Sequence, residues 1–334
     1  MRKILLASTA LVAVAGVSAA NAEISLSGNT AWGYSSWSDN VADDATTGAN
    51  NNKFLSDTDL GASWSTTTDA GLAVSASYDI DADETSASIG GDWGTVSWAD
   101  GADAQEVGQG DGLAVTSVTT GTTTADYNGE EGISGGSIAY SNSISGIDFG
   151  AGMTNGGGSS LADETSFGVG YSAEVGGGAT VTVGYSVGTT TADNTSATTT
   201  KAKENSLNGT VAFGDVTIGF ARNSKTVEMN TPDNASDFRS YEDYTSSNMS
   251  VSYAISDSLS ISAESVAAKG DQGGSTAGNT LATDYKYDRT SYGLDYTIAS
   301  GVALTASYSD YSEAGTYATA DGLSGSSTMV RVKV

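Results

Sequence analysis

Short segments in which apolar and polar residues alternate follow one another from about residue 23 to the end of the chain. Around residues 181–187, for example, Val, Val, Tyr and Val alternate with Thr, Gly and Ser. A period of two predicts a β-strand with two different faces. The pattern predicts about sixteen strands, at 23–34, 55–67, 71–79, 84–91, 94–99, 136–143, 146–154, 164–174, 178–188, 204–213, 215–224, 246–255, 258–268, 288–298, 301–311 and 326–334.

The links between these predicted strands alternate between very short and longer ones. The short links carry turn-forming residues, as at 92–93 and 176–177. The longer polar links are predicted at 35–54, 80–83, 100–135, 155–163, 189–203, 225–245, 269–287 and 312–325. Tight turns alternating with long loops are typical of a transmembrane antiparallel up-and-down β-barrel. The predicted fold class is therefore an all-β barrel that spans a membrane.

One face of each predicted strand is rich in Val, Leu, Ile, Phe and Tyr, and the other face carries Ser, Thr and Gly. Sixteen strands form a ring too wide for side chains to fill, so we expect an aqueous lumen. The apolar face then meets lipid and the polar face meets water. We expect Val334 to pair beside the first strand near Ile24 and Leu26, which would close the ring and leave no free sheet edge.

The first 22 residues have the parts of a secretory signal peptide. Arg2 and Lys3 precede an apolar run, and Ala20-Asn21-Ala22 forms a small-residue cleavage site. The apolar run is shorter than the roughly 20 residues of a membrane helix. We therefore expect cleavage before Glu23 and a single barrel domain over residues 23–334.

Composition excludes several classes of function. The chain has 40 acidic and 13 basic residues, a net charge of −27, and neither cysteine nor histidine. Phosphate recognition needs Lys and Arg, so nucleic acid is not an expected partner. Disulfides, thiolate metal sites and histidine-based catalysis are excluded, and we do not expect an enzyme. The acidity has two explanations, solvated outer loops or a negative interior that favours cations.

Two motifs resemble the trimeric general porins of alphaproteobacteria. They are MRKILLASTALVAVAG followed by EISLSG at residues 23–28, and SASIGGDWGTVSWAD at residues 86–100. The resemblance implies a homotrimeric porin in the outer membrane of a Gram-negative bacterium. Such a pore lets small hydrophilic solutes and ions diffuse passively. It also implies that the third loop folds into the barrel and narrows the pore.

The matching third loop is the segment 100–135, which is rich in carboxylates. The resemblance implies that these line the constriction, although they could instead solvate an exposed loop. The residues are Asp100, Asp103, Glu106, Asp111, Asp126, Glu130 and Glu131.

Charged residues on the polar face of the predicted strands are candidates for the pore wall. They are Glu84, Glu264, Arg289, Asp295, Arg331 and Lys333. In the resembled family a basic cluster faces the third loop, but here no basic residue falls on predicted strands two to nine. We therefore expect the pore to be cation-selective. The chain also departs from the family in ending on Val334 rather than on an aromatic residue.

Asp79, Asp81 and Asp83, followed by Glu84, form an acidic run that could bind structural calcium. The run lacks the spacing of an EF-hand loop, so a solvated loop is the alternative. No other cofactor is expected.

A different function class also fits the composition. A secreted or surface-attached structural or adhesive β protein could be equally acidic and rich in Gly, Ser and Thr. Discrete conductance steps from an oligomer that resists SDS would distinguish a pore from such a protein.

Overall fold

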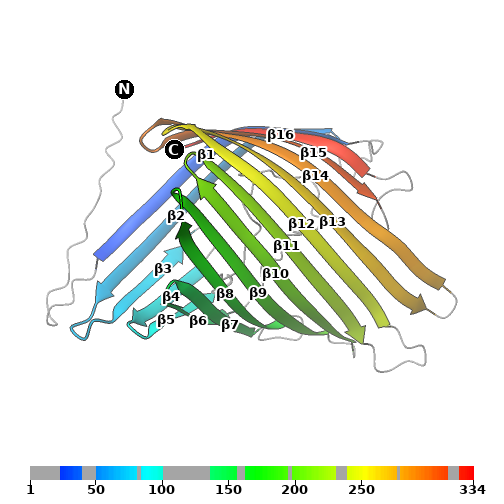
Figure 1. The fold of residues 1–334 in the computed structure, drawn as a ribbon, viewed down its shortest axis with the longest axis horizontal. Helices are drawn as coiled ribbons and strands as arrows, with labels where there is room; N and C mark the ends of the chain where they lie inside the picture. The colour runs from blue at the N-terminus through cyan, green and yellow to red at the C-terminus, as the bar shows by residue number, and fades with distance from the viewer. Residues whose placement is uncertain are drawn as a thin grey trace.

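The computed structural model describes residues 23–39, 50–80, 84–100, 136–155, 162–194, 198–230, 239–276, 279–314 and 323–334. Within these ranges the chain forms sixteen strands, each antiparallel to its neighbours, and β16 pairs with β1 to close a barrel (Figure 1). The predicted fold class is therefore confirmed. The strands are β1 (Glu23–Asp39), β2 (Asn50–Thr67), β3 (Ala73–Asp79), β4 (Glu84–Gly91), β5 (Gly94–Asp100), β6 (Gly136–Ile144), β7 (Ile147–Asn155), β8 (Ala162–Val175), β9 (Ala179–Asn194), β10 (Thr198–Phe213), β11 (Val216–Asn230), β12 (Arg239–Ser256), β13 (Leu259–Thr276), β14 (Asn279–Ala299), β15 (Val302–Ala314) and β16 (Leu323–Lys333).

Seven short links join each even-numbered strand from β2 to β14 to the strand that follows it. Because neighbouring strands are antiparallel, these links share one rim of the barrel, here called the turn rim, and the opposite end is the loop rim. Between β6 and β7, Ser145 and Gly146 both have positive φ angles, of 56° and 80°. Two such residues form the type I′ turn that matches the twist of a tight hairpin. The positions predicted for the short links are confirmed.

Several strands are longer than the alternation predicts. The predicted long link 269–287 is mostly strand, because β13 continues to Thr276 and β14 begins at Asn279, and these two residues pair. The predicted links 189–203 and 225–245 are also largely strand. Apolar alternation marks only the part of a strand that faces lipid, whereas backbone pairing continues into the polar hairpin beyond it. For the same reason β2 includes Lys53, so the expectation of no basic residue on strands two to nine is wrong.

The barrel closes in a different register from the predicted one. Val334 exchanges backbone hydrogen bonds with Thr30, at 2.9 and 2.8 Å, rather than lying near Ile24 and Leu26. Closing a tilted sheet requires a stagger between its first and last strands. The beginning of β1 therefore extends past the end of β16 and pairs with β2.

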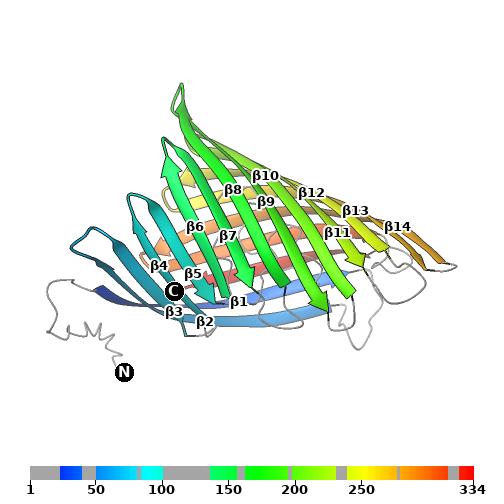
Figure 2. The ribbon, with the colours of Figure 1, turned by 90° about the horizontal axis from the view of Figure 1, so that it is seen from below.

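The height of the wall is uneven around the ring. Strands β3, β4 and β5, here called the low wall, have 7, 8 and 7 residues. Strands β12, β13 and β14, the high wall, have 18, 18 and 21 residues (Figure 2). A tilted strand needs about 9–11 residues to cross a bilayer, so the low wall falls short of that length. No helix among the described residues has the length and apolarity of a membrane span.

Candidate pore wall

The two faces of each strand carry different side chains. On β14, Ser291 is fully buried, whereas its neighbour Tyr292 is 54% exposed. On β15, Ser309 is also fully buried, whereas Tyr308 is 41% exposed. Side chains crowd together on the concave face of a closed sheet and diverge on the convex face. The apolar set therefore lies outside and the small polar set lines the interior, as the alternation predicts.

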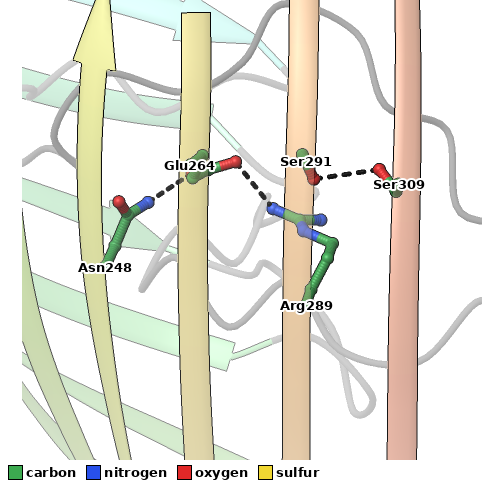
Figure 3. Close-up of polar contacts among 5 residues, drawn as sticks. All are labelled: Asn248, Glu264, Arg289, Ser291 and Ser309. Carbon is green, nitrogen blue, oxygen red and sulfur yellow. Dashed lines mark hydrogen bonds and ion pairs between the residues drawn. The ribbon is translucent and has the colours of Figure 1, made fainter.

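A charged network crosses three strands of the high wall (Figure 3). Glu264 of β13, only 4% exposed, accepts a hydrogen bond from the Asn248 amide of β12 on Oε1. Its other oxygen, Oε2, lies 3.3 Å from the Arg289 guanidinium of β14. A carboxylate buried this deeply needs partners, because removing a charge from water is costly. The amide and the guanidinium supply them from the two flanking strands.

Small hydroxyl side chains continue the wall beside this network. The hydroxyls of Ser291 and Ser309 are 2.9 Å apart and join β14 to β15 (Figure 3). Further buried serines occur on neighbouring strands at Ser246, Ser250, Ser307 and Ser327. Short side chains leave the lumen wide, and their hydroxyls keep it polar.

Two further ion pairs lie on the inward face. The ammonium group of Lys225 on β11 is 2.8 Å from the Glu204 carboxylate on β10. The Arg331 guanidinium on β16 is 2.6 Å from the Asp57 carboxylate on β2. The second pair spans β1, where Gly33 is opposite Arg331 in the register. Because Gly33 has no side chain, Arg331 can pass over β1.

Each of the three basic residues in these pairs therefore faces a carboxylate. An adjacent opposite charge cancels much of the field that a cation would project into the lumen. Lys225, Arg289 and Arg331 therefore project less positive potential into the lumen than unpaired basic residues would.

The structure brings most of the predicted wall residues to one face. Glu264, Arg289 and Arg331 make the contacts above, and Asp295 and Lys333 occupy positions of the same parity on β14 and β16. Glu84 is the first residue of β4, but its side chain lies outside the described part of the chain.

The predicted constriction residues cannot be placed in the same way. Asp100 ends β5, and its side chain is outside the described part. The other six are also outside the described residues: Asp103, Glu106, Asp111, Asp126, Glu130 and Glu131.

Of the calcium candidates, Asp79 ends β3, whereas Asp81 and Asp83 fall outside the described residues. Where the structure describes the chain, it contains no group of three or more His, Cys, Asp or Glu residues that could hold a metal ion.

Four wall residues were missed from the sequence: Asp57, Asn248, Glu204 and Lys225. The signal available for them was the alternation of inward-facing and outward-facing positions along each strand. Asn248, for example, alternates with Met249 and shares its face with Ser250. The partners themselves carry no such signal, because Asp57 and Arg331 are 274 residues apart.

Comparison with known proteins finds a matching family model and solved structures of similar fold. The family model described as Gram-negative porin matches residues 7–316. A porin structure refined at 1.8 Å is 16% identical, with a TM-score of 0.59, and covers 93% of this chain and 100% of its own. The trimer form of OmpT from Vibrio cholerae is 13% identical, with a TM-score of 0.63, covering 93% and 99%. An anion-selective porin from Comamonas acidovorans is 14% identical, with a TM-score of 0.59, covering 93% and 100%. No curated protein matches the sequence.

Proposed function

The chain belongs to the Gram-negative porin family, and on that premise we propose that its pore is cation-selective. Proteins of this family are outer-membrane channels for passive diffusion rather than enzymes. The opening residues and the segment 86–100 support a place among the trimeric general porins of alphaproteobacteria. The solutes are small and hydrophilic, since the described wall offers hydroxyls and charges beside one apolar cluster of Ala268, Tyr287 and Tyr311.

The pairing of three wall basic residues carries this proposal, whereas Lys53 and Lys333 share the inward parity and have no ion pair among the described residues. Lys225, Arg289 and Arg331 each lie within 3.3 Å of a carboxylate. The chain as a whole carries 40 acidic and 13 basic residues. Carboxylates that outnumber neutralised bases make the lumen potential negative, which concentrates cations.

Selectivity need not follow the fold. The Comamonas acidovorans protein is described as anion-selective, yet at 14% identity only its architecture is shared. Charge on the wall is set by individual residues, which differ freely between proteins of one fold.

The proposal assigns the constriction to the third loop, which joins β5 to β6 through residues 101–135. Its carboxylates would add to the negative wall. This link lies outside the described residues, so the assignment rests on its acidic sequence and on its position in the chain.

We further propose a homotrimer that assembles through the low wall. The strands β3 to β5 have at most 8 residues, fewer than a lipid-facing strand needs. Contact with neighbouring copies would shield this side of the barrel from lipid. One of the Vibrio cholerae structures is described as a trimer form.

Reversal potentials in planar bilayers test the selectivity. Under a KCl gradient we expect discrete conductance steps and a reversal potential of the sign that marks K⁺ as the more permeant ion. A preference for Cl⁻ would refute cation selectivity. The adhesive alternative predicts no conductance steps and no SDS-resistant, heat-modifiable oligomer.

A further inference from the structure

The first strand has a bare backbone edge at the turn rim. From Glu23 onwards β1 pairs with β2, but β16 reaches β1 only as far as Thr30, which exchanges backbone hydrogen bonds with Val334. Residues 23–29 therefore extend past the end of β16, over about 23 Å of strand (Figure 1). No described residue pairs with their other side, so the expectation that closure leaves no free sheet edge is wrong at this end.

Every second residue of this overhang directs its backbone groups to the bare side. Thr30 directs both its N–H and its C=O to β16, and this direction alternates along an antiparallel strand. Ile24, Leu26 and Gly28 therefore direct theirs the same way. Among the described residues, nothing pairs with these three donors and three acceptors.

The overhang lies on the aqueous side of the turn rim. At the start of β15, Ala303 pairs with Lys333, so the end of β16 is level with the short link at 300–301. Residues 23–29 continue beyond this level. Outer-membrane barrels keep their short turns on the periplasmic side, and unpaired backbone groups are far less costly in water than in hydrocarbon. The edge is therefore open to chains in the periplasm.

The edge lacks the features that usually protect a sheet edge, which are charged side chains, proline and bulges. Residues 24–29 are Ile-Ser-Leu-Ser-Gly-Asn, and their pairing with β2 is regular. By contrast, the half of β2 that extends past β3 at the loop rim carries Lys53, Asp57 and Asp59. The outward side chains of the overhang are apolar and uncovered, with Ile24 56% and Leu26 72% exposed.

Charge near the edge favours a basic partner. The short links of the turn rim contain no lysine or arginine, and their charged residues are exposed aspartates: Asp69, Asp92, Asp215 and Asp257. Asp69 is the nearest to the edge, because Glu23 pairs with Ser65, four residues before it. Lys333 also lies at this end of β16, but at an inward-facing position. Opposite charges across an interface steer association and exclude wrong partners.

We propose that this edge binds an extended, basic segment of a periplasmic protein, which adds to the barrel as a strand antiparallel to β1. The segment continues the line of β16, and its backbone pairs with Ile24, Leu26 and Gly28. Main-chain hydrogen bonds supply the affinity in this mode of recognition. Apolar residues on the outer face of the segment cover Ile24 and Leu26, and its flanking Lys or Arg residues face the acidic turn rim.

Binding of a synthetic peptide to the purified mature oligomer in detergent tests the edge. The probe is the fluorescently labelled peptide KKVTVTVTVKK, and we expect saturable binding by fluorescence anisotropy. Proline in place of the central threonine should weaken binding at least about tenfold, because it disrupts strand pairing. The peptide EEVTVTVTVEE should bind several-fold more weakly than the lysine peptide. Absence of saturable binding, or equal binding of the lysine and glutamate peptides, would overturn the proposal.

Leu26→Pro removes one N–H of the edge. This N–H faces the bare side, so the pairing with β2 is kept, and proline is tolerated at such positions of edge strands. We expect the affinity for the lysine peptide to fall at least about tenfold. Leu26→Ala is the matched control, because it shortens the same side chain but keeps the N–H, and its affinity should stay within about threefold of the wild type. Equal losses in the two variants would refute strand addition, and both should keep wild-type conductance.

Amide hydrogen exchange followed by NMR tests the edge without any substitution. In the wild type, Ile24, Leu26 and Gly28 should exchange fast, whereas Ser25 and Ser27, which pair with β2, should exchange slowly. The lysine peptide should slow the first three amides. If these amides are already slow without the peptide, or stay fast when it is saturating, the edge is not the binding site and the proposal fails.

Discussion

The Arg331 guanidinium on the last strand lies 2.6 Å from the Asp57 carboxylate on the second strand and bridges over the first. This contact ties the two ends of the chain together where the barrel closes. It is partly solvated, with side-chain exposures of 28% for Arg331 and 51% for Asp57.

A double-mutant cycle should measure this contact. We expect Arg331→Met and Asp57→Asn to couple by about 0.5 kcal/mol, since exposed ion pairs contribute little. Urea unfolding of the reconstituted barrel gives the four free energies that the cycle needs. A coupling energy of zero would mean that the two charges do not interact in the folded barrel.

Gly33 should tolerate a side chain poorly. An added Cβ would lie 2.6 Å from the Val330 carbonyl oxygen and 3.3 Å from Arg331 Cα, so backbone would have to move. We expect Gly33→Ala to lower the free energy of unfolding by about 1–3 kcal/mol. Gly188→Ala is the control, because its Cβ would meet nothing closer than 3.6 Å. Equal costs for both variants would argue against crowding at the seam.

Glu264 should matter more for stability than other wall carboxylates. Its side chain is 2% exposed and its partner Arg289 is 17% exposed, so Glu264→Gln leaves a largely buried guanidinium without a counter-charge. We expect a loss of about 3 kcal/mol. Glu204→Gln breaks the more exposed pair with Lys225 and should cost about 1 kcal/mol or less. The same urea titration measures both, and the reverse order of costs would contradict the burial argument.

Neutralising carboxylates of the third loop should weaken the preference of the pore for cations. We expect the variant D103N/E106Q/D111N to lower the K⁺ to Cl⁻ permeability ratio in a bilayer, because fewer carboxylates would then face the permeating ion. Asp310→Asn removes a charge from the outer face and should leave the ratio unchanged. If the triple variant behaves like Asp310→Asn, these carboxylates do not line the pore.

The mature protein should begin at Glu23. Intact-mass measurement of the outer-membrane fraction should show the loss of residues 1–22, because the small residues Ala20 and Ala22 mark a signal-peptidase site. Replacing Ala22 with a bulky residue should lead to accumulation of the precursor. A mature protein that retains Met1 would refute the cleavage.

The number of strands, the positions of the turns and the side chains on each face could be predicted, because each depends only on residues that are close in the sequence. Val181 and Thr182 alternate whatever the rest of the chain does. Strand extents could not be predicted in the same way, since the polar residues around Thr276 and Asn279 pair through their backbones.

The closing register depends on the stagger of the whole ring, which no local segment encodes. This is why Val334 is opposite Thr30, and why the pairing of Arg331 with Asp57 had no signal in the sequence. The wall charges Glu264, Arg289 and Arg331 were found because they alternate with apolar residues. Only Asp57, the partner of Arg331, depends on the closing register.

The uneven height of the wall makes the rim of the pore entrance oblique. At about 3.3 Å per residue and a tilt of about 40°, the 21 residues of β14 rise about 50 Å, whereas the 7 residues of β5 rise about 18 Å. Among the described strands, the rim of the barrel mouth is therefore oblique and lowest at the low wall. In the proposed trimer, three such mouths would face the central axis and share one vestibule. An ion would then be drawn in by the combined acidic surface of three copies before it enters any one of them.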